Sequence, residues 1–127
     1  MIAFGREYPL LLTVGAMEEI TARCPDGDIR RLRELLDGKT NDVVDFMADF
    51  IAALSRGAEE NRRFTAMAAG ERYMPAPVTP EMLRALPQEE FKAAQAEALR
   101  VWKGDAAPTV EAEAKKNGDA APAPASV

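Results

Sequence analysis

The sequence predicts an α+β fold that is mostly α-helical: an N-terminal β-hairpin, a bundle of about six helices and a disordered C-terminal tail. Two observations predict the folded part. Apolar residues alternate around a Gly-containing turn at the start, and they then recur at helical spacing as far as position 103. The length of 127 residues suits one domain, because domains usually run to about 100–150 residues. We therefore assign residues 1–103 to a single helical domain with its hairpin and residues 104–127 to the tail.

A β-hairpin is predicted at the N-terminus. Ile2 and Phe4 alternate around Ala3, as in a half-buried strand. Gly5-Arg6 is the expected two-residue turn, and Tyr8–Thr13 continues as a second β-rich strand. Gly at the first central position suits a type II′ turn, whose twist matches that of paired strands. Because a two-stranded hairpin is only marginally stable by itself, we expect it to pack against the helices that follow.

Two short helices are expected next. The first has Thr13 as its candidate N-cap and ends at the turn formed by Pro25–Gly27. Its apolar stripe consists of Met17, Ile20 and Cys24. Asp28 is the candidate cap of the second helix, which Gly38 ends. The apolar residues of this second helix are Ile29, Leu32, Leu35 and Leu36.

The strongest helical signal opens at Thr40-Asn41-Asp42 and predicts a core helix of roughly fifteen residues. Its broad apolar face consists of Val43, Phe46, Met47, Phe50, Ile51 and Leu54. Gly57 is expected to break this helix, and a further helix over Ala58–Ala69 follows with Phe64 and Met67 turned inward. The charged residues expected on its exposed side are Glu59, Glu60, Arg62 and Arg63.

The remaining part of the domain is predicted as a loop and two helices. Gly70–Pro77 is the loop, and Thr79 is an N-cap followed by Pro80 at the first helical position. The short helix that starts there carries Met82, Leu83 and Leu86. Pro87 separates it from a last helix over Gln88–Lys103. The apolar side of this last helix consists of Phe91, Ala94, Ala98, Val101 and Trp102.

The tail differs in composition from everything that precedes it. Gly104–Val127 is rich in Ala and Pro and contains no Leu, Ile, Met, Phe, Tyr or Trp. Such a segment cannot bury enough apolar surface to offset the entropy lost on ordering. We therefore predict that it is disordered.

The composition removes several classes of chemistry. Without histidine, the chain has no Ser/His/Asp or Cys/His relay and no histidine metal ligand. Cys24 is the only cysteine, which excludes an intrachain disulfide and a Cys-rich zinc site. A net charge of −5 gives no overall attraction for nucleic acid. We expect a binder or assembly factor and not an enzyme, with no catalytic residues, no metal and no cofactor.

The start of the chain predicts its compartment. Gly5, Arg6, Glu7 and Pro9 interrupt Met1–Val14, so a secretory leader is not expected. No stretch approaches the ~20 apolar residues that a membrane helix needs. The single cysteine fits a reducing compartment. These features predict a cytoplasmic protein without a membrane partner.

Two arrangements of carboxylates could carry chemistry. Asp42, Asp45 and Asp49 share one helical face and could hold Ca²⁺ or Mg²⁺, but a rigid helix rarely brings enough oxygen atoms around one ion. A solvated polar face opposite the apolar one is favoured. Glu18-Glu19 and Glu59-Glu60 are poor acid/base pairs, because neighbouring helical side chains diverge by about 100° and both pairs are expected on polar faces.

Basic residues gather in two places: Arg30, Arg31 and Arg33 in one cluster, and Arg62 and Arg63 in the other. The helices expected over Val14–Cys24 and Ile29–Leu36 loosely resemble a helix-turn-helix, which would make the chain a small DNA-binding regulator. Acidic residues flank the first cluster, and no aromatic residues are interleaved with it. Ion pairs on exposed helix faces are therefore the favoured explanation, and no nucleic-acid partner is expected.

Partner-binding residues are predicted near the loops and near the end of the last helix. Aromatic side chains and methionine at such places are common at partner surfaces, although they also form the edge of a small core. The candidates are Phe64, Met67, Tyr73, Met74 and Trp102. We expect the contact on the exposed part of the hairpin and in the region from Phe64 to Met74.

The order of these parts resembles the tail assembly chaperones of long-tailed bacteriophages and prophages, over residues 1–103. The segments that carry the resemblance are the hairpin Phe4–Thr13, the charged helix Val14–Ile20, the apolar helix Val43–Leu54, the sequence Arg56–Asn61 that ends it, the helix start Val78–Leu83 and the closing amphipathic helix. No catalytic motif marks this family. The resemblance implies a non-catalytic chaperone.

The resemblance also implies partners. Members of the family bind the long, aggregation-prone tape-measure protein and keep it soluble while tail-tube subunits polymerise around it. They are absent from the finished particle. We therefore expect the tape-measure protein as the client, with the tail-tube protein and a second copy of the chain as further candidate partners.

Many family members have a short form and a longer frameshifted form. Ala114-Lys115-Lys116 is what a slippery run of adenines would encode, so Lys115 and Lys116 are the candidate frameshift position. A solvated linker with two lysines explains the same residues. The codons themselves decide between the two: a run without the slippery heptamer removes the frameshift.

A different phage part, a head–tail connector or tail-completion protein, is the first alternative. It predicts ring formation and presence in purified particles, whereas a chaperone is missing from them. The DNA-binding regulator is the second alternative, and it predicts retention on DNA at moderate salt.

Overall fold

The computed structural model describes residues 1–36 and 41–104. Its elements in chain order are β1 (Ile2–Ala3), β2 (Arg6–Glu7), α1 (Val14–Arg23), the 3₁₀ turns η1 (Pro25–Gly27) and η2 (Ile29–Arg31), α2 (Leu32–Leu36), α3 (Asn41–Ala68), α4 (Pro80–Arg84) and α5 (Gln88–Lys103). This part of the chain is mostly helical, with a short two-stranded hairpin and five α-helices where about six were predicted. The predicted signals at Gly38 and Thr40 and the predicted disorder of residues 105–127, with Lys115 and Lys116, lie outside it.

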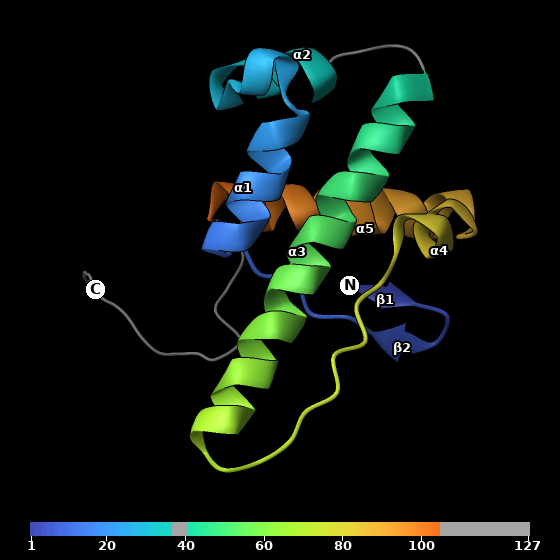
Figure 1. The fold of residues 1–127 in the computed structure, drawn as a ribbon. Helices are drawn as coiled ribbons and strands as arrows, with labels where there is room; N and C mark the ends of the chain where they lie inside the picture. Colours follow the sequence, from blue (N-terminus) through green and yellow to red (C-terminus); the bar gives the residue numbers. More distant parts are fainter. Residues whose placement is uncertain (37–40, 105–127) are drawn as a thin grey trace.

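The long helix α3 organises the arrangement (Figure 1). Helix α1 packs along the N-terminal half of α3, and α2 lies at the same end. Helix α5 crosses α3 near its middle, with α4 packed on α3 beside it and the hairpin strand β1 against α5. The C-terminal half of α3 extends past the other helices, flanked by the returning segment of residues 70–79.

The hydrophobic core lies around the N-terminal half of α3. The predicted apolar face is confirmed here, because its fully buried members are Phe46, Met47, Phe50, Ile51 and Leu54. The other elements add Ile20 from α1, Leu83 from α4, Ala94 and Ala98 from α5, and Val78 from the segment before α4. Each fully buried large apolar side chain stabilises the fold by about 1.5–3 kcal/mol, so this cluster dominates folding.

Side-chain caps fix the starts of three helical segments as the sequence predicted. The Thr13 hydroxyl accepts a hydrogen bond from Ala16 N at 3.1 Å, and the Thr79 hydroxyl accepts one from Met82 N at 3.2 Å. Asp28 caps η2, which continues directly into α2. The predicted bounds of the last helix are confirmed without change.

The hairpin is present, but its predicted turn and second strand are wrong. Ala3 pairs with Arg6, so the two turn residues are Phe4 and Gly5. Both have positive φ (54° and 72°), which identifies the type I′ geometry in place of the predicted type II′ turn. Tyr8 still pairs with Met1 in the hairpin register, since Tyr8 N donates to Met1 O and the N-terminal amine donates to Tyr8 O, both at 2.7 Å. Residues 9–13 are not a strand, and Leu11 N donates instead to Leu54 O of α3 at 3.1 Å.

The buried stripe of α1 also differs from the prediction. Ile20 and Cys24 are buried, but Met17 is exposed and Ala16 takes its place. Residues 16, 20 and 24 repeat every four positions, so they follow one face of the helix. A small residue at position 16 lets α1 lie close to α3.

Gly57 was expected to break the core helix, and this prediction is wrong. Helix α3 continues through Gly57 and is 28 residues long in all. The missing side chain instead makes room for the chain before α1: a Cβ atom at Gly57 would lie 2.7 Å from Leu11 O and 2.8 Å from Thr13 Oγ1. Glycine is needed at this position for close approach and not for a turn.

Gly57→Ala should destabilise the protein by about 1–3 kcal/mol, because backbone atoms of residue 11 must move away. The higher helix propensity of alanine, about 1 kcal/mol, opposes this loss and does not cancel it. Gly15→Ala in α1 is the control: the nearest atom to its new Cβ is 4.0 Å away, so stability should rise. Urea unfolding measures both, and a Gly57→Ala protein as stable as the parent would contradict the packing described.

Candidate partner-binding surface

The C-terminal half of α3 forms an overhang, which we define as residues 58–68. Thr13 lies against Gly57, so α1 starts at this level and runs toward the N-terminal end of α3. No other helix lies along the overhang in Figure 1. Glu59 is accordingly the last buried residue of α3, and residues 60–68 are exposed or partly exposed. Beyond that point only the segment of residues 70–79 returns beside the helix.

Phe64 and Met67 lie on the overhang, and the prediction that they turn inward is wrong. Phe64 is 54% exposed and Met67 is 57% exposed. The Arg63 guanidinium lies 4.2 Å from the centroid of the Phe64 ring and also pairs with Glu60 at 2.7 Å. These contacts hold the aromatic ring in place at the surface.

Glu59 is the best-buried charged side chain among the described residues, only 2% exposed, although the sequence placed it on a polar face. Its Oε1 accepts hydrogen bonds from the Tyr73 hydroxyl at 2.7 Å and from Ala76 N at 2.9 Å. Arg62 lies 3.9 Å from its other oxygen. The returning segment buries Glu59, and the spacing of the two segments in the sequence gives no signal of this contact.

A second buried polar contact fastens the same segment. The Ser55 hydroxyl accepts a hydrogen bond from Val78 N at 2.9 Å, and both residues are fully buried. Buried polar groups need such partners, because an unpaired one costs about 1–3 kcal/mol. The contacts of Ser55 and Glu59 therefore hold residues 73–78 against one side of α3.

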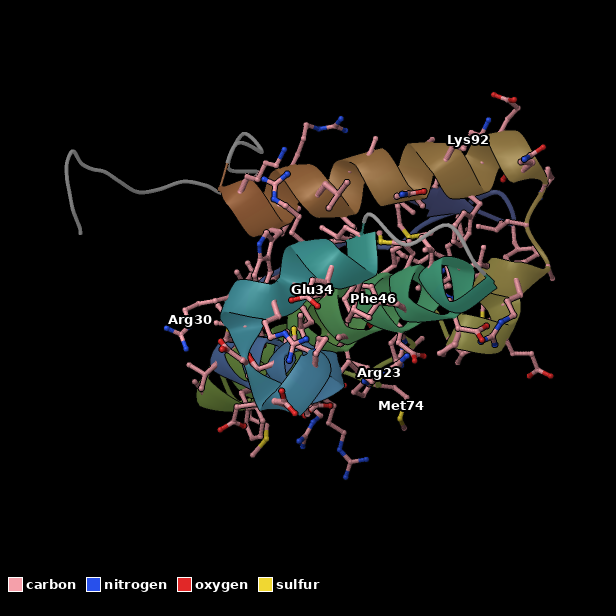
Figure 2. The ribbon with its side chains drawn as sticks, turned by 90° about the horizontal axis from the view of Figure 1, so that it is seen from above. Arg23, Arg30, Glu34, Phe46, Met74 and Lys92 are labelled. Atoms are coloured by element: carbon pink, nitrogen blue, oxygen red, sulfur yellow. The ribbon has the colours of Figure 1, made fainter. Side chains whose placement is uncertain are left out.

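Met74 projects from this fastened segment. It is 85% exposed, and Figure 2 shows its side chain directed away from the helices. Tyr73, partly buried, precedes it and is held by Glu59, so the position of Met74 is set by the fold. Trp102 belongs to another place: it is partly buried and packs on Phe50, with ring centroids 5.6 Å apart.

The structure thus brings four of the five predicted partner-binding residues to the overhang and its returning segment. We define the overhang surface as Phe64, Met67 and Met74, the three that are largely exposed. The hairpin, also predicted to contact a partner, exposes Ile2 and Phe4.

A cleft between α1 and α3 is a feature that sequence reasoning missed. Its volume is about 290 Å³, and its apolar floor consists of Ile20, Phe46, Phe50 and Ala53. Two ion pairs stand at its rim and join the helices: Arg23 with Asp49, and Glu19 with Arg56. Arg23 also lies 5.9 Å from the Phe46 ring centroid.

The carboxylates considered as metal ligands have other partners. Asp45 pairs with Arg84 of α4 at 2.7 Å, and Asp49 pairs with Arg23. The side chain of Asp42 lies outside the described part. Within the described ranges, no group of three or more candidate ligands could hold a metal ion.

Four of the five arginines in the two clusters have ion-pair partners: Arg30, Arg31, Arg62 and Arg63. Arg30 donates to both oxygens of Asp28, and these hydrogen bonds lower the pKa of the Asp28 carboxyl. Arg31 pairs with Asp26 and Glu34. Such pairing removes much of the positive potential that a phosphate backbone would need.

Comparison of the chain with family models, with curated proteins and with solved structures finds no match. None of the described helices is long and apolar enough to cross a lipid bilayer.

Glu59→Ala should destabilise the protein by about 1–3 kcal/mol, because the Tyr73 hydroxyl and Ala76 N both lose their buried acceptor. Amide hydrogen exchange at Ala76 should become markedly faster. Glu60→Ala is the control, since Glu60 is exposed and its neighbour Arg63 is the only partner described for it. Equal stability and equal exchange in the two variants would contradict a fastening role for Glu59.

Cys24 gives a pH-dependent prediction. Burial, and then the nearby charge of Asp28, raise the pKa of the Cys24 thiol above its ordinary value. The unfolded chain therefore loses this proton at lower pH than the folded protein, and stability falls as pH rises above about 8.5–9. Cys24→Ala has no thiol and does not lose stability in this way. The free energy of unfolding of the parent, measured in urea, should therefore fall relative to that of the variant between pH 7 and about pH 9.5. Parallel pH profiles of the two proteins would refute the assignment.

Proposed function

We propose that this chain is a non-catalytic tail assembly chaperone of a long-tailed bacteriophage or prophage. In this function it binds the tape-measure protein and keeps it soluble while the tail tube assembles. The observation that carries the proposal is the overhang surface: Phe64, Met67 and Met74 are exposed on a framework that holds them in fixed places. The order of elements described above, which resembles that family, supplies the identity of the client.

The overhang surface has properties that suit a helical client. An amphipathic helix presents apolar residues at i, i+3, i+4 and i+7, and it binds where a partner offers a matching apolar face. Met67 and Met74 are flexible and polarisable, so they can adapt to different client side chains. Because α3 and the contacts of Glu59 already order the surface, binding requires little further loss of conformational entropy.

The charge of the chain fits the same function. Each copy carries a net charge of −5, so client segments covered by several copies repel one another and stay dispersed. Many weak contacts along one long client add through avidity, and no single copy needs high affinity. The chaperone would act in the host cytoplasm and leave before the particle is complete.

The proposal predicts that the gene directly downstream encodes a long, helix-rich protein, and that co-expression with this chain will raise the soluble fraction of that protein. The Phe64→Ser/Met67→Ser double variant should bind at least about tenfold more weakly, because interface anchors of this kind dominate affinity. Val14→Ser, on α1 and 80% exposed in the parent, is the matched control and should bind as the parent does.

Two results would remove the proposal. One is the absence of both solubility rescue and co-purification with the wild-type chain. The other is stable presence of the chain in purified particles, which would instead support the connector alternative.

A further inference from the structure

We propose that the cleft between α1 and α3 and the overhang surface form one continuous track for a single client helix, with one large apolar side chain of that helix seated in the cleft. This inference rests on the proposed function and specifies how the client is bound. Three features carry it: the spacing of residues along α3, the size and lining of the cleft, and the order of charges at its rim.

The spacing places both regions on one face of α3. Asp49, Ala53 and Arg56 line the cleft, and Glu60, Phe64 and Met67 follow at the same helical spacing: steps of 4, 3, 4, 4 and 3 residues. Helix α1 covers the neighbouring face only as far as Gly57. A client helix that enters between α1 and α3 therefore continues onto Phe64 and Met67. At 1.5 Å per residue, the track is about 27 Å long and matches roughly eighteen client residues.

The cleft has the size and chemistry of a site for one side chain. Its volume of about 290 Å³ is at the lower limit of pockets that hold small molecules, which start at about 300 Å³. A leucine, methionine or phenylalanine side chain fits within it. The floor formed by Ile20, Phe46, Phe50 and Ala53 offers apolar atoms and no polar side-chain group, so the occupant gains from burying apolar surface.

The charged residues at the rim of the cleft determine which charges the client helix should carry beside its seated apolar side chain. At one end α1 contributes the acid, Glu19, and α3 the base, Arg56; at the other end α1 contributes the base, Arg23, and α3 the acid, Asp49. Along the track, the α1 wall therefore changes from acidic to basic while the α3 wall changes from basic to acidic. At each end of the cleft, a complementary client helix places a basic residue beside the acid of one wall and an acidic residue beside the base of the other wall. Helices in coiled coils pair charges in the same way along the two sides of their apolar seam.

The same rim argues against a charged small ligand. A phosphate or free carboxylate would have to separate Arg23 or Arg56 from its present acid and leave that acid unpaired beside the cleft. A client helix with charges of both signs can replace each partner that it displaces.

The first test blocks the cleft. Ala22 lines the cleft from the exposed side of α1, so Ala22→Phe fills it without entering the core. Ala93→Phe, at an exposed position of α5, is the matched control. The probes are overlapping 25-residue peptides that cover the product encoded downstream and contain no tryptophan. The fluorescence of Trp102, the only tryptophan and a neighbour of Phe50, reports binding.

We expect the peptide that binds the parent to bind Ala22→Phe at least about tenfold more weakly and Ala93→Phe unchanged. Equal affinity for the parent and Ala22→Phe would overturn the track. If the Phe64→Ser/Met67→Ser protein still loses affinity in that case, the proposed function stands and only the cleft is wrong. If no peptide binds the parent and no solubility rescue occurs, the proposed function itself fails.

The second test reverses the rim. The double variant Glu19→Arg/Arg56→Glu keeps an ion pair between α1 and α3 but exchanges its direction. We expect unfolding like that of the parent and at least about fivefold weaker binding of the same peptide, with affinity restored when the flanking charges of the peptide are exchanged as well. A purely structural ion pair would leave peptide affinity unchanged, and that result would overturn the role of the rim.

Discussion

The close approach of the N-terminal segment to α3 at Gly57 is the constraint on which the rest of the structure depends. Leu11 N donates to Leu54 O, and the absent side chain of Gly57 leaves room for Leu11 O and the Thr13 side chain. Thr13 then caps α1, so this crossing point sets where α1 begins and toward which end of α3 it runs. On the N-terminal side of the crossing α1 and α2 pack against α3, whereas no described helix lies along α3 on the other side.

The part of α3 beyond the crossing would be a poorly supported helix without the returning segment. Ser55 and Glu59 lie on neighbouring turns of α3 and bind the backbone of Val78 and Ala76, so they fasten this segment along one side. Phe64 and Met67 receive no such cover and stay more than half exposed. The same arrangement therefore supports the overhang and leaves its apolar face available for binding.

The sequence predicts what depends on neighbouring residues and fails where distant segments meet. Thr13 and Thr79 were identified as caps because a hydroxyl acts on an amide three residues away. Gly57 resembled a helix break, and Glu59 a solvated charge, because only the tertiary contacts with residues 11 and 76 reveal their roles. Phe64 was expected to turn inward because helical periodicity marks an apolar side without telling whether another element covers it. The candidate surface could thus be listed from the sequence, but the cleft beside it could not.

In the proposed function, the rim of the cleft also explains how a bound client can leave. Arg23 and Arg56 have carboxylate partners within the chain, so client binding exchanges one set of ion pairs for another and the net electrostatic gain is small. Affinity then has to come from apolar contact with the cleft floor and the overhang surface. When the client departs, the internal pairs re-form and no charge remains unpaired. A chaperone that must hold a long client and later give it up to tube subunits needs this balance: enough apolar contact for many copies to bind together, and no large electrostatic barrier to release.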